Sequence, residues 1–127
     1  MTAPPGAWYH AGMEAKLHPV LTIRLFAEEK CFGPGVASLL DGVEEQHSLR
    51  AAAAAMGMAY SKAWTIIRRA EDQLGFKLLL STTGGKHGGG AALTAEASEL
   101  LAAYRAYCAA LHDSAETLFA QYFPSFL

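Results

Sequence analysis

The sequence predicts a mainly α-helical protein with one small β-hairpin and a long helix at its C-terminal end. Three observations lead to this fold class: two segments with helical spacing of apolar residues, a glycine-rich loop between two brief apolar runs, and a heptad pattern near the C-terminus. With 127 residues, 52% of them hydrophobic, the chain can build one domain around a single core. Such a core needs neither disulfides nor a metal ion.

The chain divides into three segments of different composition. Residues 1–18 are rich in Pro, Gly and Ala and are expected to form a flexible lead, whereas residues 19–93 form the folded domain and residues 94–127 a C-terminal helix. No run approaches the roughly 20 apolar residues of a membrane span. The N-terminus also lacks the basic and apolar regions of a signal peptide. We therefore expect a cytoplasmic protein.

A short strand and a helix are expected to open the domain. In residues 20–26, alternate side chains give one strongly apolar face, which predicts a strand. The break at Gly33-Pro34-Gly35 then separates this strand from a helix over about 36–46, where apolar residues follow the spacing of one buried helix face.

Two further helices follow within thirty residues. Ser48 can cap a helix that runs to Met56, and Gly57 can end it. The third helix covers residues 60–74 and ends at Gly75. Its expected core stripe consists of Ala63, Ile67, Ala70 and Leu74.

A glycine-rich hairpin comes next in the chain. A strand is predicted from Lys77 to Thr82 and a second one over residues 91–93, with the loop GGKHGGG between them at residues 84–90. Thr94 can then cap the last helix, which is expected to run to about Tyr122.

Apolar residues of the last helix are spaced alternately by four and three positions. We call this set the heptad seam: Ala97, Leu101, Tyr104, Cys108, Leu111, Ala115, Leu118 and Tyr122. Such a pattern is typical of helices that pair with another helix, so we expect a homodimer formed through the seam from Leu101 onward. A helix that lies along its own domain would show the same spacing. However, a small three-helix core offers little surface to cover roughly 40 Å of helix.

Charge is distributed unevenly along the chain. The formal net charge is −2, which argues mildly against binding to nucleic acid. Residues 48–90 nevertheless carry six Lys or Arg against two acidic residues, a net charge of +4. The middle of the chain is therefore a basic island between two acidic parts.

The order of these elements is that of a winged helix-turn-helix followed by a long dimerisation helix. The third helix takes the place of the helix that enters the major groove of DNA, and the hairpin forms the wing. Polar and charged side chains of the third helix point away from its core stripe: Ser61, Lys62, Thr65, Arg68, Arg69 and Asp72. We call this set the outward face. It suits contact with base edges and phosphates, although an ordinary solvated helix face has a similar composition.

Three stretches of residues 33–104 carry a more specific resemblance. They read GPGVASLLDGVEEQHSLRAAAAAMGMAYSKAW, AEDQLGFKLLL and TTGGKHGGGAALTAEASELLAAY. This region resembles the N-terminal DNA-binding domain of the ModE family of molybdate-responsive regulators, most specifically through Tyr60, Ala63 and Trp64 together with the doubled glycines of the wing. More distantly, the part from Ser48 to Leu79, together with Leu93-Thr94, resembles the LysR-type helix-turn-helix.

The resemblance implies a dimeric transcription factor that binds double-stranded DNA. It places four residues on the recognition helix: Tyr60, Ser61, Lys62 and Thr65. It places Ser48 and Arg50 at the start of the supporting helix and Lys86 in the wing. We also expect Arg68 and Arg69 to contact DNA because they lie on the outward face, and His87 because it lies in the wing. Trp64 is expected to be a packing anchor between the third helix and the wing, with a base contact as the alternative.

The sequence departs from the family pattern at four places. Ala59 stands where a serine often precedes the tyrosine, and alanine cannot cap the recognition helix. Leu80-Ser81 replaces an acid–arginine pair, which removes an expected phosphate contact. His87 stands where glycine is usual. Oxyanion-binding domains are expected to be absent because the sequence ends at residue 127, so the resemblance supports DNA binding and not molybdate sensing.

Other classes of function fit the sequence less well. We expect no enzyme, metal site or cofactor, because the five histidines are scattered and no GK[ST] follows the glycine loop. Backbone N–H groups of that loop could form a nest for a small anion, but mobile glycines bind anions weakly. The main alternative is an interaction module that dimerises with a related full-length regulator without binding DNA, which the alanines at positions 54, 55 and 59 and Ser81 favour.

Overall fold

A computed structural model describes residues 16–82 and 89–127 of the chain. These residues form two compact units, a larger one of Thr22–Cys108 and a smaller one that combines residues 16–21 with Ala109–Leu127. The elements, in chain order, are β1 (Leu25–Phe26), β2 (Lys30–Phe32), α1 (Pro34–Gln46), α2 (Leu49–Ala55), α3 (Tyr60–Leu74), β3 (Leu79–Thr82), β4 (Gly90–Leu93), α4 (Ala95–Tyr122) and a one-turn 3₁₀ helix (Pro124–Phe126). The predicted fold class, a winged helix-turn-helix followed by a long helix, is confirmed.

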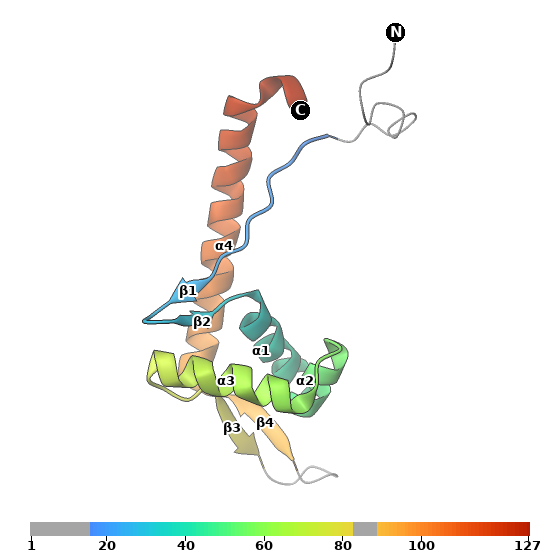
Figure 1. Ribbon diagram of the computed structural model, residues 1–127, viewed down its shortest axis with the longest axis vertical. Helices are drawn as coiled ribbons and strands as arrows, with labels where there is room; N and C mark the ends of the chain where they lie inside the picture. The colour runs from blue at the N-terminus through green and yellow to red at the C-terminus, as the bar shows by residue number, and fades with distance from the viewer. Residues whose placement is uncertain (1–15, 83–88) are drawn as a thin grey trace. The chain divides into compact units, whose positions relative to one another are not determined.

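Helices α1, α2 and α3 enclose the core of the larger unit (Figure 1). Its largest fully buried side chains are Phe32, Leu39, Leu40, Val43, Ile67 and Leu78. Small residues bring α1 and α2 close together: a Cβ atom added at Gly42 would lie 2.7 Å from the Cβ of Ala52. Since real Cβ atoms do not approach so closely, only glycine at position 42 permits this packing.

The strand predicted over residues 20–26 is mostly absent. Only Leu25–Phe26 forms a strand, and it pairs antiparallel with Lys30–Phe32, a segment for which no strand was predicted. The apolar face of this segment is only partly covered, because Ile23 and Leu25 pack against the core whereas Leu21 is 42% exposed. The carbonyl of Ile23 instead accepts a hydrogen bond of 2.7 Å from the Tyr104 hydroxyl, so this segment is held by a side chain rather than by a neighbouring strand.

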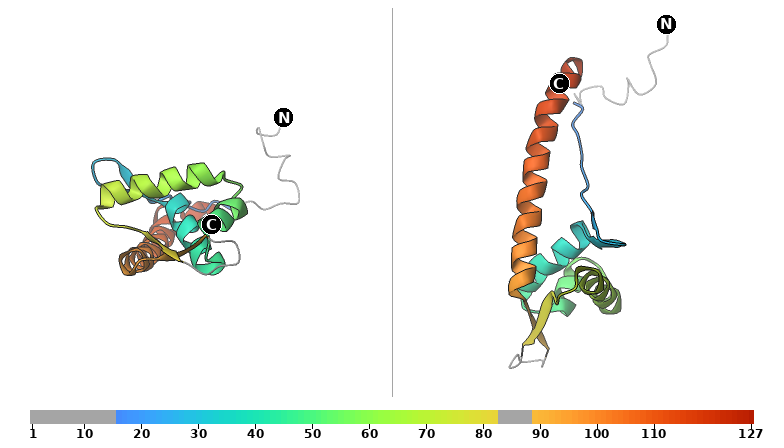
Figure 2. Two further views of the ribbon diagram at one scale, coloured as in Figure 1. Left: turned by 90° about the horizontal axis from the view of Figure 1, so that it is seen from below. Right: turned by 90° about the vertical axis from the view of Figure 1, so that its left-hand side faces the viewer.

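Strands β3 and β4 form the expected hairpin. They pair antiparallel with Leu79 opposite Leu93 and Thr82 opposite Gly90. The first strand begins two residues later than predicted, at Leu79. The two residues before it bond to side chains: the Lys77 carbonyl accepts from the Thr94 hydroxyl, and the Leu78 N–H donates to the Glu71 carboxylate. The hairpin extends from the side of the larger unit on which α3 lies (Figures 1 and 2).

Helix α4 has 28 residues and begins at the predicted cap, where the Thr94 hydroxyl accepts a 3.0 Å hydrogen bond from the Ala97 N–H. Only the first part of the heptad seam is buried: Ala97, Leu101 and Tyr104 are at most 5% exposed. Cys108, Leu111 and Ala115 are partly exposed, whereas Leu118 and Tyr122 are 51% and 74% exposed. Within the described residues, no helix is long and apolar enough to span a membrane.

Candidate nucleic-acid interface

Helices α2 and α3 form the helix-turn-helix, and each starts differently. The Ser48 hydroxyl caps α2 by accepting a 3.1 Å hydrogen bond from the Ala51 N–H, as predicted. At the start of α3, Ala59 occupies the N-cap and offers no side-chain hydrogen bond. Gly57, with φ of 65°, makes the turn between the two helices. Buried Ala52, Ala53 and Ala63 let the helices pack closely, so α3 is positioned by this packing and not by a side-chain cap.

The outward face of α3 is exposed, as the sequence predicts. All six of its residues are exposed, while Ala63, Ile67 and Ala70 on the opposite side are at most 2% exposed. The Thr65 hydroxyl donates a 3.0 Å hydrogen bond to the Ser61 carbonyl, which leaves the Thr65 oxygen as an acceptor. The side of α3 away from the core therefore offers hydrogen-bonding groups next to positive charge.

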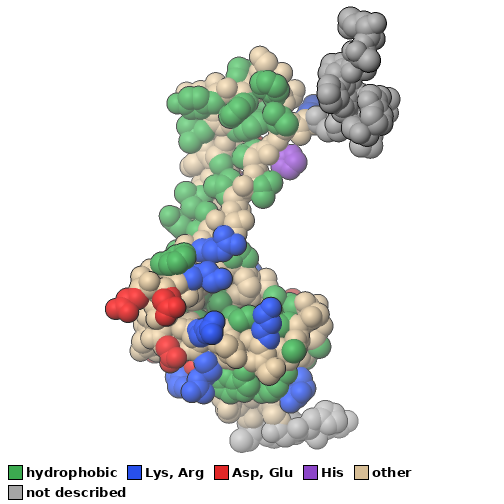
Figure 3. All heavy atoms as spheres, viewed as in Figure 1, with side chains coloured by type: hydrophobic (Ala, Val, Ile, Leu, Met, Phe, Trp, Pro, Cys, Tyr) green, Lys and Arg blue, Asp and Glu red, His purple; other side chains and the backbone are tan. Residues whose placement is uncertain are grey.

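Four basic residues of the helix-turn-helix have no carboxylate within ion-pair distance among the described residues: Arg50, Lys62, Arg68 and Arg69. Among the described residues, the Lys and Arg side chains that form ion pairs are Lys77, with Glu71, and Arg105, with Asp41. Lys and Arg side chains are spread over the larger unit in Figure 3, whereas hydrophobic side chains dominate the visible surface of the smaller one. The unpaired cations of the larger unit are thus free to meet phosphate groups.

Arg50 and Tyr60 connect the two helices of the motif. The Arg50 guanidinium carbon lies 4.2 Å from the centroid of the Tyr60 ring, within the range of a cation–π contact. Arg50 is exposed, while Tyr60 is half-buried and packs against the core. The ring therefore holds the Arg50 charge close to the N-terminus of α3, and Ser48, whose hydroxyl is used by the cap, contributes mainly to the position of α2.

Trp64 does not have the surroundings expected of a packing anchor. Its side chain is 41% exposed and is not among the residues that form or contact the hydrophobic core. The Arg68 guanidinium carbon lies 5.4 Å from the centroid of its ring. This exposure argues against the packing role that the sequence favoured, and it places an aromatic ring beside the outward face.

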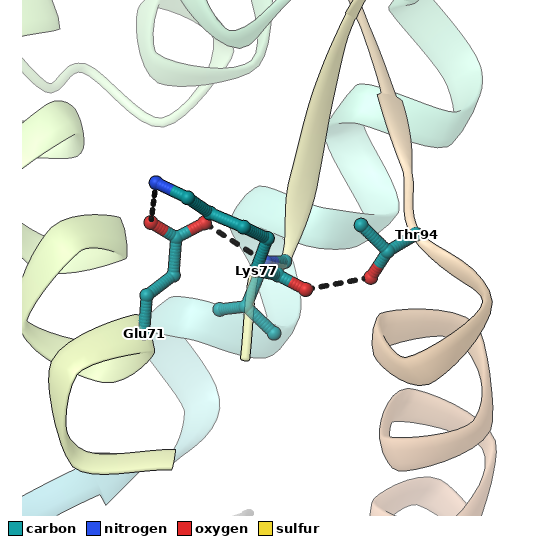
Figure 4. A network of polar contacts seen from close by, with 4 residues as sticks. Glu71, Lys77 and Thr94 are labelled. Atoms are coloured by element: carbon teal, nitrogen blue, oxygen red, sulfur yellow. Dashed lines mark hydrogen bonds and ion pairs between the residues drawn. The ribbon is translucent and has the colours of Figure 1, made fainter. Parts of the chain in front are cut away.

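A polar network fixes the base of the wing to both neighbouring helices (Figure 4). Glu71, 8% exposed, accepts a 2.8 Å hydrogen bond from the Leu78 N–H, and its second oxygen lies 3.7 Å from the Lys77 ammonium. On the other side, the Thr94 hydroxyl donates to the Lys77 carbonyl at 2.7 Å. The start of β3 is thereby tied to α3 through Glu71 and to α4 through Thr94.

Sequence reasoning did not identify Glu71 as part of this network. One signal was present: Glu71 follows Ile67 by four residues and so lies on the inner side of α3. A buried carboxylate needs hydrogen-bond donors, and the turn after Gly75 supplies them. Lys86 and His87, the expected wing contacts, lie outside the residues that the structure describes.

Comparison with known proteins agrees with this geometry. Residues 38–98 match the family described as bacterial regulatory helix-turn-helix protein, lysR family. The chain is also similar to the molybdenum transport protein ModE of Herbaspirillum seropedicae, with 40% identity over 68 residues that cover 54% of this chain and 25% of that protein. A similar match links it to the molybdenum-pterin-binding protein MopB of Rhodobacter capsulatus, with 36% identity over 69 residues, 54% of this chain and 26% of that protein.

The chain thus spans about a quarter of the length of both relatives. The matched segment is a helix-turn-helix of the LysR and ModE type, which confirms the resemblance seen in the sequence.

Proposed function

We propose that this chain is a sequence-specific transcriptional regulator that binds double-stranded DNA in the cytoplasm. The observation that carries the proposal is the outward face of α3, which combines exposed hydroxyl groups with unpaired cations on the second helix of a helix-turn-helix. A helix of this kind fits the major groove, where side chains reach base edges while nearby cations contact phosphates. The Arg50 guanidinium, held over Tyr60, is well placed to contribute one of these phosphate contacts.

We further propose that the regulator is a homodimer. The buried residues Leu101 and Tyr104 belong to the core of the larger unit, so the dimer contact falls to the later part of the heptad seam, from Cys108 to Tyr122. Large apolar side chains of the smaller unit remain exposed and favour such a contact: Leu118, Tyr122, Phe123, Phe126 and Leu127. Exposed apolar surface of this extent usually marks a protein–protein interface.

The wing is proposed to add contacts with the DNA backbone through Lys86 and His87. Phosphate contacts carry little sequence information, so Lys86→Ala should weaken binding to all duplexes about equally. His87 should contribute more below about pH 6.5, where imidazole gains its charge. The names of the two relatives refer to molybdenum, but the matched segment covers only 25% and 26% of them, so our proposal does not extend molybdenum binding to this chain.

Binding to a mixed-sequence duplex over a series of salt concentrations tests the proposal. The logarithm of the binding constant should fall linearly with the logarithm of salt, with a slope of about −0.9 for each phosphate contacted. Lys62→Ala should make this slope shallower by about 0.9 per protomer. Lys16→Ala, which removes the same charge outside the helix-turn-helix, should leave the slope unchanged. Absence of salt-dependent binding by the parent protein would refute the proposal.

A second candidate function is an interaction module that pairs with a full-length regulator of the same type. It is supported by a surface next to the turn that is poor in polar side chains. Ala54, Ala55 and Ala59 are all exposed there and offer no side-chain hydrogen bonds. The salt series distinguishes the two candidates. An interaction module would associate with a purified ModE-type regulator yet show no salt-dependent affinity for DNA.

A further inference from the structure

Trp64 is an apolar ring in otherwise polar surroundings. It lies in the first half of α3, between Ser61 and Arg68 on successive helical turns, and next to Thr65. With 41% of its surface exposed and no place in the described hydrophobic core, the ring keeps a large apolar surface open to a partner. A large exposed aromatic side chain on a helix that faces a ligand is typical of a contact residue.

Arg68 limits the orientations that this ring can take. Its guanidinium carbon lies 5.4 Å from the ring centroid, one helical turn further along α3. A cation–π contact of this kind favours one arrangement of the two side chains and covers part of one ring face. No carboxylate among the described residues forms an ion pair with Arg68, so its charge remains available near the ring.

The major groove of DNA offers one apolar group to such a ring. Base edges there present hydrogen-bond donors and acceptors, except for the C5-methyl group of thymine. Hydroxyl and basic side chains on either side of Trp64 suit the polar edges and the phosphates. The apolar face of the indole ring suits the methyl group, although its one N–H group can also donate to a base acceptor. N-terminal residues of a recognition helix are the ones that reach the base edges, and Trp64 is the fifth residue of α3.

We propose that Trp64 contacts a thymine C5-methyl group in the major groove, and that Arg68 acts as a positioning residue for its ring. Trp64 then determines part of the sequence specificity, as a requirement for thymine at one position of each half-site. This inference rests on the proposed DNA-binding function and adds to it the residue and the base involved.

The experiment uses the full chain and duplexes selected from a pool with a randomised central segment. In a selected duplex, each thymine is replaced in turn by uracil, which removes the methyl group and leaves base pairing intact. We expect affinity to fall about fourfold at one position per half-site, the effect of burying one methyl group. If no position distinguishes thymine from uracil although the duplex binds, the inference is wrong while DNA binding stands.

Variants assign the effect to Trp64. Trp64→Ala should bind thymine and uracil duplexes equally, and Trp64→Phe should keep part of the discrimination because it retains an apolar ring. Tyr107→Ala, which removes a 52% exposed aromatic ring from α4, serves as the control and should keep the fourfold ratio. Discrimination that survives in Trp64→Ala would overturn the proposal.

Arg68→Lys tests the positioning role separately. The substitution keeps the positive charge, so the salt dependence of binding should stay the same, but it loses the planar group that stacks on the ring. Discrimination between thymine and uracil should therefore fall below the parent ratio. An unchanged ratio would show that Trp64 needs no support from Arg68 and would remove that part of the proposal. If the parent protein binds no duplex at all, the proposed function fails and this inference fails with it.

Discussion

The two halves of α4 share one heptad pattern but differ in what covers them. In the first half, Leu101 and Tyr104 are 5% and 4% exposed, whereas in the second half Leu118 and Tyr122 are 51% and 74% exposed. The spacing of apolar residues is the same throughout. Periodicity therefore predicts a helix and its apolar face, but it does not reveal whether that face meets its own domain or another molecule.

Specific contacts account for the burial of the first half. The Tyr104 ring packs edge-to-face on Phe32, with ring centroids 5.0 Å apart, and its hydroxyl donates to the Ile23 carbonyl. Arg105 forms an ion pair with Asp41 of α1. In the smaller unit, the described aromatic contacts are local ones, between Phe123 and its neighbours Phe119 and Phe126. The second half of the heptad seam thus keeps the apolar surface that we assign to the dimer.

Truncation of one leucine in each half should give the largest difference. Leu101→Ala removes a buried side chain and should lower the free energy of unfolding by about 2–5 kcal/mol. Leu118→Ala, at an exposed position, should change the free energy of unfolding of the monomer by no more than about 0.5 kcal/mol. Urea denaturation at low protein concentration measures both. Equal losses in the free energy of unfolding would mean that the two halves of α4 do not differ in burial.

Introduction of a charge in the second half should abolish the dimer and leave the fold intact. Leu118→Asp places a carboxylate in the proposed apolar interface, where burial of an unpaired charge is unfavourable. Sedimentation equilibrium should show a monomer with an unchanged circular dichroism spectrum. Gln121→Asp adds the same charge outside the heptad seam and should remain a dimer. A parent protein that is itself monomeric would contradict the dimer proposal.

Removal of the Tyr104 hydroxyl should have a smaller effect, confined to the first half. Tyr104→Phe leaves the Ile23 carbonyl without its partner and should cost about 1–3 kcal/mol of stability, with no change in the dimer. Burial, followed by the neighbouring Cys108 thiol, raises the pKa of Tyr104 above its ordinary value of 10.0.

The raised pKa of Tyr104 makes stability depend on pH in the alkaline range. The unfolded chain loses the tyrosine proton first, so the stabilisation is complete below pH 10.0 and is lost as pH rises through the pKa of the folded state. Thermal midpoints measured on both sides of pH 10 should fall more steeply for the parent than for Tyr104→Phe. If the thermal midpoints of the parent and of Tyr104→Phe fall in parallel with rising pH, Tyr104 does not cause the loss of stability.

The smallest predicted effect is a gain in stability at the start of α3. Ala59 holds the N-cap without a side-chain hydrogen bond, so Ala59→Ser should stabilise the domain by about 0.5–2 kcal/mol. Dimerisation should not change, since α3 and the second half of α4 belong to different units. A thermal midpoint that does not rise would mean that serine cannot reach the free N–H groups of the first turn.

Local signals in the sequence predicted most helix boundaries correctly. Ser48 and Thr94 cap the helices they were expected to cap, and Gly75, with φ of 82°, ends α3 as expected. These signals succeed because a cap or a positive φ depends on the nearest few residues alone. The outward face of α3 was predicted for the same reason, since helical spacing separates it from the core stripe.

Features that depend on contacts between different elements were missed. The strand at residues 20–26 is short because its partner is Lys30–Phe32, and apolar alternation carries no information about a partner. The exposure of Trp64 could not be foreseen either, because a tryptophan at that spacing is compatible with packing or with solvent. Glu71 was overlooked because its partners, Lys77 and the Leu78 N–H, come from the turn after the helix.

Backbone amide chemical shifts, followed by NMR as duplex DNA is added to the full chain, test the central claim most directly. The outward face of α3 is proposed to enter the major groove, so the amides of Tyr60–Leu74 and of the start of α2 should shift most, with those of Ala109–Leu127 nearly unchanged. Shifts confined to Ala109–Leu127, or none in α3 while DNA binds, would contradict the account.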